Sequence, residues 1–235
     1  MLRSHLVPAL LVAVGLGVVA PLAGSGAAVA AVDRGSATSY KLEKVGGAVV
    51  RWNPCEPVHY RVATEGAPVG ALADTQAAVA RVAQETGLTF VYDGPTSTIP
   101  TKKGPRPDGI TVAWAAKGSG KGKSDLLPGG STLGVGGWNV AYTVADKTGA
   151  ISNVHIVNGF VLLDTRSNKL PRGFADRKGG TRGELLEHEL GHAVGLGHVS
   201  DKSQVMYPKL GPHTSFGAGD KAGLRKVGKA AGCTT

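Results

Sequence analysis

The chain has 235 residues, of which 42% are apolar and 18% charged, and its formal net charge at pH 7 is +9. This apolar fraction supports a packed core and excludes a disordered chain, and the length fits one sizeable domain or two small ones. The positive charge is dispersed and not interleaved with aromatic residues, so it favours weak association with polyanions such as cell-wall polymer and argues against specific nucleic-acid recognition.

Residues 1–31 have the features of a signal peptide. Arg3 precedes an apolar run from Leu6 to Val19, and Ala28-Val29-Ala30 offers a cleavage site of small residues. The alternative is an uncleaved membrane anchor, but glycine and proline residues from 15 to 26 make a poor spanning helix. We therefore expect a secreted, extracellular protein without membrane contact after cleavage, with residues 32–50 as a polar lead and 51–235 as its domain.

Hydrophobic periodicity and turn residues predict an α+β domain. Strands are expected before helices, apart from one early helix that Gly87 ends. In chain order, the expected elements are a strand at 58–62, a helix at 69–86, strands at 88–92 and 110–114, a hairpin of 133–144 and 151–163 closed near 146–149, and helices at 181–194 and 219–227.

The glycine-rich segment 118–124 ends in Gly-Lys-Ser, as a nucleotide-binding phosphate loop does. That pattern requires glycine where this chain has Lys117, and a Pro-Gly-Gly run at 128–130 interrupts any following helix. The segment is therefore interpreted as a flexible, basic surface loop.

The run from His188 to His198 reads His-Glu-Leu-Gly-His-Ala-Val-Gly-Leu-Gly-His. Residues four apart share one face of a helix, so His188 and His192 can bind one cation, and Glu189 can reach a water in an open coordination position. Gly195 can take the left-handed conformation that ends a helix, which would return His198 as a third ligand. Three nitrogens and a water form the coordination sphere of a catalytic zinc ion.

The alternative for this run is three surface histidines on an amphipathic helix, although the long motif specifies five positions and rarely arises by chance. Three other histidines, His59, His155 and His213, are expected to be half-buried or hydrogen-bonded and not to bind metal.

The long histidine motif resembles that of the metzincin zinc endopeptidases. Metzincins also carry a methionine-containing turn beneath the metal, and Met206-Tyr207-Pro208 resembles the turn of the matrixin branch. Because Pro208 stands where other branches place a metal-binding tyrosine, Tyr207 is not expected to bind zinc. The segment from Arg51 to Tyr60 resembles the start of secreted bacterial matrixin-like domains.

This resemblance implies a fold and a pocket. It implies a single catalytic domain in which a twisted, mostly parallel sheet packs on two long helices, with a small C-terminal subdomain after the third histidine. It also implies that Leu185 lines the pocket for the residue after the cleaved bond and that Leu210 belongs to its outer wall. We expect an apolar preference there.

The two cysteines, Cys55 and Cys233, lie near the two ends of the predicted domain and are expected to form a disulfide. The alternative is that Cys55 is a free thiol that caps the zinc, as a propeptide cysteine does in matrix metalloproteinases, but the family motif for that role is absent. The family's loop for a second zinc is also absent, whereas calcium could bind loop carbonyls and Asp residues.

The expected function is that of a monomeric, secreted zinc metalloprotease acting on protein or peptide substrates. Zinc held by the three histidines would activate a water, and Glu189 would act as general base in peptide-bond hydrolysis. Two alternatives remain open: an exported zinc hydrolase acting on cell-wall peptides, and a zinc-binding extracellular module without catalysis. A positioned base argues against the second, because metal capture alone gains nothing from it.

Overall fold

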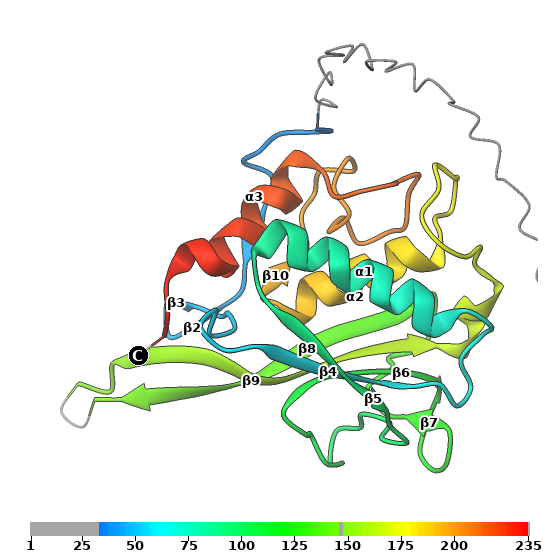
Figure 1. Ribbon diagram of the computed structural model, residues 1–235, viewed down its shortest axis with the longest axis horizontal. Coiled ribbons are helices and arrows are strands. Elements are labelled where there is room, and N and C mark those ends of the chain that lie inside the picture. Colours follow the sequence, from blue (N-terminus) through cyan, green and yellow to red (C-terminus); the bar gives the residue numbers. More distant parts are fainter. Residues whose placement is uncertain (1–32, 146–147, 235) are drawn as a thin grey trace, which may run out of the picture. The chain divides into compact units, whose positions relative to one another are not determined.

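The computed structural model describes residues 33–145 and 148–234 (Figure 1). The predicted signal peptide, and residues 146–147 of the predicted hairpin turn, lie outside the described residues. The helices are α1 (Ala71–Thr86), α2 (Arg182–Ala193) and α3 (Ala218–Val227), with 3-10 turns η1 (Thr165–Lys169) and η2 (Lys229–Ala231). The longer strands are β4 (Val58–Ala63), β5 (Phe90–Pro95), β6 (Gly109–Lys117), β8 (Gly134–Val144) and β9 (Ile151–Asp164). The two-residue strands are β1 (Lys41–Leu42), β2 (Lys44–Val45), β3 (Ala48–Val49), β7 (Lys123–Ser124) and β10 (Leu196–Gly197).

The main sheet has the order β5-β4-β6-β9-β8. Strands β5, β4, β6 and β9 run parallel to their neighbours, and β8 adds an antiparallel edge through the predicted hairpin. The prediction of an α+β fold with a mostly parallel sheet is therefore confirmed. The glycine-rich segment 118–124 is not a free loop throughout, because its last two residues pair with β6 as β7 and the Ser124 hydroxyl donates to Pro100 O at 2.6 Å.

Helices α1 and α2 pack against each other, and α2 also packs on β8 and β9 (Figure 1). Helix α1 ends where Gly87 adopts a left-handed conformation and donates to Ala83 O. The two helices are joined by a buried ion pair, in which the guanidinium of Arg182 bonds the carboxylate of Asp74. Helix α2 is thus held on the sheet and on α1, in contact with the edge strand β8.

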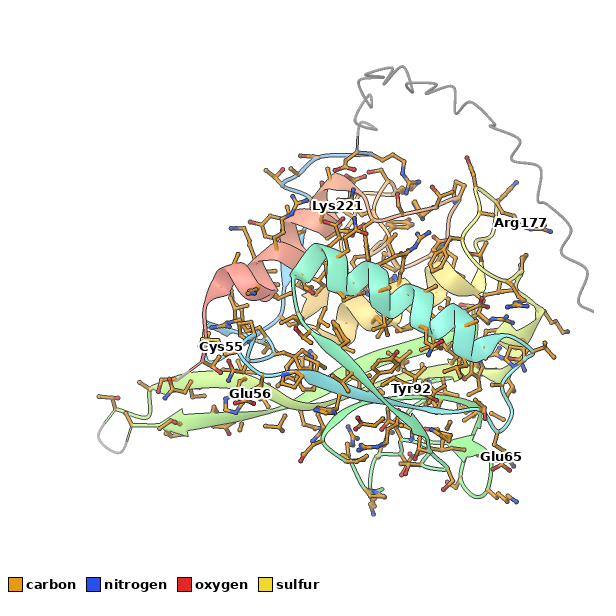
Figure 2. All side chains as sticks on the ribbon, in the orientation of Figure 1. Cys55, Glu56, Glu65, Tyr92, Arg177 and Lys221 are labelled. Atoms are coloured by element: carbon orange, nitrogen blue, oxygen red, sulfur yellow. A yellow bond between two sulfur atoms is a disulfide. The ribbon has the colours of Figure 1, made fainter. Side chains whose placement is uncertain are left out.

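Residues 33–50 lie against the rest of the domain. Strand β1 pairs antiparallel with β10, with Lys41 opposite Gly197 and Leu42 opposite Leu196. A disulfide joins Cys55 to Cys233 over a sequence separation of 178, and Figure 2 shows Cys55 on the side of the domain where the chain ends. None of the helices in the described part of the chain is long and apolar enough to cross a membrane.

Candidate metal centre and substrate cleft

Helix α2 presents the first two histidines. Its N-cap is Thr181, whose hydroxyl accepts a hydrogen bond from the backbone N–H of Glu184 at 3.2 Å. Leu186 and Leu190 are fully buried and fix the rotation of the helix on the core. His188 and His192 therefore project together from one face, as their spacing predicts.

The chain reverses directly after α2 and returns the third histidine. Gly195 has a φ of 108°, and a Cβ there would collide with the carbonyl oxygen of Val50. The following strand β10 is held by β1, and His198 comes next in the chain. Gly195 thus lies at the chain reversal, as predicted. The lead segment, through β1, pairs with the strand that precedes His198.

The three imidazoles converge through their Nε2 atoms. The Nε2–Nε2 distances are 3.1 Å from His188 to His198, 3.2 Å from His188 to His192 and 3.0 Å from His192 to His198. The Nδ1 atoms of His188 and His192 donate to Val205 O at 2.7 Å and Leu196 O at 2.8 Å. A neutral imidazole that donates through Nδ1 has a lone pair on Nε2, so these lone pairs face one another.

This donor set fits a zinc ion. Facing lone pairs at such distances repel unless a cation lies between them, and tetrahedral zinc–nitrogen bonds of about 2.0–2.1 Å place the nitrogens about 3.3 Å apart. Burial lowers the pKa of His188 to about 3 and that of His192 to about 4, which keeps both rings neutral at physiological pH. Within residues 33–145 and 148–234, a cluster of side chains that could hold a metal ion is found at these three histidines.

Glu189 lies between α2 and the edge strand β8. Its side chain is 4% exposed, and the backbone of Gly136 bonds its carboxylate. A Cβ on Gly134 would lie 2.6 Å from Glu189 Oε1, so only glycine leaves room for the carboxylate at this position. Burial raises the pKa of Glu189 to about 8, and a cation held by the adjacent histidines would lower it again.

The methionine turn lies beneath the histidines. It is closed by the Val199 N–H, which donates to Met206 O at 3.1 Å. Met206 is 1% exposed, and its Sδ approaches Gly191 of α2 so closely that a Cβ on Gly191 would collide with it. Asp220 of α3 fixes the turn from below, because its carboxylate accepts from the backbone N–H groups of Val205 and Met206.

A cavity of about 740 Å³ opens over these residues. Its walls include the three histidines, Glu189 and the predicted pocket residues Leu185, Pro208 and Leu210. The start of β8 forms the opposite wall, with residues 131–136. The structure thus brings the predicted metal-binding, base and pocket residues to one cleft, whereas the predicted supporting residues Gly195, Met206 and Tyr207 are not among the residues that line it.

The remaining histidines lie elsewhere. The Nδ1 of His59 lies 2.8 Å from Asp93 Oδ1, that of His155 lies 3.0 Å from Asn153 O, and His213 is paired with Glu184. Each is hydrogen-bonded, as the sequence predicted.

Two comparisons with known proteins found similarity to metalloproteinases. The family model of the matrixins matches residues 143–227, which include the histidine motif and the methionine turn. This part of the chain therefore resembles the matrixin branch of the metzincins. The chain is also similar to Metalloendoproteinase 1-MMP of Arabidopsis thaliana, with 46% identity over 46 residues. That match covers 18% of this chain and 13% of the plant protein.

Sequence reasoning missed the residues that position Glu189. Gly134 and Gly136 lie in a strand that was predicted only as half of a hairpin. Two glycines on one face of a strand do indicate the close approach of another backbone or side chain, but nothing in the pattern says that the neighbour is Glu189. The bond from His188 to Val205 O was also not predictable, because it joins residues whose proximity depends on the turn between them.

Proposed function

We propose that this protein is a secreted, zinc-dependent endopeptidase that hydrolyses peptide bonds with Glu189 as general base. The observation that carries the proposal is the convergence of three imidazole Nε2 atoms on one point, in a cleft that the neighbouring carboxylate of Glu189 also lines. The matrixin match over residues 143–227 supports the same chemistry.

His188, His192 and His198 would hold the zinc, which when bound acidifies a water and polarises the substrate carbonyl. Glu189 accepts a proton from the attacking water and passes it to the nitrogen of the leaving amine, so the reaction needs no covalent intermediate. The bonds to Val205 O and Leu196 O fix the ring orientations of the first two histidines, which keeps the three nitrogens aimed at one point.

The cleft supports a preference for an apolar residue after the cleaved bond. Leu185 and Leu210 lie on its walls. Of the residues that line the cleft, Lys209 alone is a lysine or arginine. A buried apolar pocket discriminates by size and penalises an unpaired charge. A peptide library should therefore show cleavage before aliphatic or aromatic residues, and selection of charged residues there would refute this assignment.

Secretion is part of the proposal. It is supported by the predicted signal sequence in residues 1–31 and by the disulfide between Cys55 and Cys233, which requires an oxidising compartment to persist. We further propose a monomer whose basic surface associates weakly with polyanions at low salt.

The test compares the wild type with Glu189→Ala, His192→Ala and a surface control, Glu65→Ala. The wild type should hold one zinc per chain and cleave casein, with activity lost to a chelator and restored by zinc. Glu189→Ala should keep its zinc but lose hydrolysis, His192→Ala should lose both, and the control should keep both. Full activity in Glu189→Ala, or cleavage of isolated cell-wall peptides but not of casein, would refute the proposal.

A further inference from the structure

The outer wall of the cleft, defined as residues Pro208 to Ser215, contains one buried side chain. Pro208, Lys209 and Leu210 line the cavity, and the residues from 211 to 215 connect them to the rest of the domain. Within this wall only His213 is buried, with 3% of its surface exposed. A buried imidazole in an otherwise exposed segment suggests that the segment is fastened through that side chain.

The partner of His213 is Glu184, a residue of α2 that is 1% exposed. Glu184 Oε1 accepts from His213 Nδ1 and from the backbone N–H of Gly211, the latter at 2.9 Å. The other ring nitrogen of His213 lies 2.9 Å from the carbonyl oxygen of Lys202. Because both ring nitrogens face acceptors, His213 is a double donor, and the Glu184 carboxylate raises its pKa.

This pair lies directly behind the cleft. A Cβ on Gly180 would be 2.7 Å from Glu184 Oε2 and 2.7 Å from Leu210 Cβ, so the backbone at Gly180 fills the space between the carboxylate and the wall. Leu185, the next residue of α2, lines the same cavity as Leu210. The spacing of the two leucines is therefore set by how the wall is fastened to α2.

The far end of the wall has separate anchors. The guanidinium of Arg34 donates to Pro212 O at 3.2 Å and to Ser215 O at 2.6 Å, and Arg81 donates to Thr214 O. These bonds reach the wall from the lead segment and from α1. The bonds from Glu184 to Gly211 and His213 therefore attach the wall to α2 closest to Leu210.

We propose that Glu184 and His213 are positioning residues that fix the width of the cleft, so that the protein selects by size the apolar side chain that follows the cleaved bond. This rests on the proposed peptidase function, since the cleft must bind a peptide for its width to matter. Neither residue touches the reacting atoms. Their effect is on how well a given side chain fits between Leu185 and Leu210.

The first test uses peptides that differ only in the residue after the cleaved bond, leucine or tryptophan. His213→Leu removes both hydrogen bonds, whereas His213→Asn keeps a donor near the position of Nδ1, and His155→Leu is the matched control on β9. For His213→Leu we expect KM for the leucine peptide to rise roughly tenfold and the leucine-to-tryptophan selectivity to fall by a similar factor, because a charge-assisted bond is lost. The value of kcat should stay within about threefold, since the base and ligands do not move.

His213→Asn should recover most of the selectivity, and the control should match the wild type. Unchanged selectivity in His213→Leu, or a loss in kcat with no change in selectivity, would overturn the proposal.

A second measurement separates this proposal from the proposed function. Amide hydrogen exchange at residues 209–213 of the full chain, without substrate, should speed up by roughly tenfold or more in His213→Leu and little in His213→Asn. If His213→Leu does not fold, Glu184→Gln takes its place, because it keeps the shape and loses the charge. A wild type that cleaves no peptide would refute the peptidase, whereas unchanged exchange in the folded variant would refute the fastening of the wall.

Discussion

Replacing Gly134 with alanine is expected to slow peptide hydrolysis without releasing the metal. Gly134 does not have a positive φ, so alanine fits its backbone and the substitution tests contact alone. The new Cβ would lie 2.6 Å from Glu189 Oε1 and 2.9 Å from Cδ and Cγ, where ordinary contacts begin at 3.4 Å. The carboxylate must therefore move by about 1 Å, and a misplacement of that size costs roughly a hundredfold in rate, or about 2.7 kcal/mol of activation free energy.

The assay measures kcat on a fluorogenic peptide and zinc affinity by competition with a chromophoric chelator. We expect kcat to fall roughly a hundredfold, with zinc affinity within about threefold of the wild type, because the three atoms nearest to the new Cβ all belong to Glu189. Gly137→Ala is the matched control, because it lies on the same strand and its Cβ would press on the Phe160 ring at 2.8 Å instead of on Glu189. A Gly134→Ala protein with wild-type kcat would refute the role of Glu189 as base.

Three further predictions concern stability, measured by urea unfolding. The free energy of unfolding of the Cys55→Ser/Cys233→Ser protein should be lower than that of the wild type by up to about 5 kcal/mol, because the disulfide closes a loop with a separation of 178 residues. Equal unfolding free energies of the wild type and this variant would contradict the cross-link. Asp74→Ala should cost about 3–5 kcal/mol, because it leaves the buried guanidinium of Arg182 without its partner, and a cost below 1 kcal/mol would argue against the pair. The third concerns His213, whose pKa in the folded protein is raised from 6.5. Its protonated form stabilises the protein fully below about pH 6.5, and this contribution is lost as the pH rises through the raised value. The stability difference between the wild type and His213→Leu should therefore be larger at pH 6 than at pH 9, and the opposite trend would show that His213 is neutral in its pair.

The grouping of the three histidines with Glu189 could be predicted from the sequence because their geometry is local. His188 and His192 are four residues apart on one helix, and Gly195 allows the reversal that returns His198. The helix and strand order also followed from periodicity and turn residues, because each element is encoded within its own segment. The predicted pairing of the two cysteines needed only their number and the export that residues 1–31 predict.

Tertiary structure decided what surrounds these residues. The fit of Glu189 against Gly134, the bond from His188 to Val205 O and the pairing of Glu184 with His213 join segments between 17 and 55 residues apart, and no local pattern encodes which segments meet. The same holds for β1, a two-residue strand with no periodicity to detect, which exists because β10 offers it a partner. Sequence alone therefore determined the chemistry that the helix can carry, whereas long-range packing decided how Glu189 is held and how wide the cleft is.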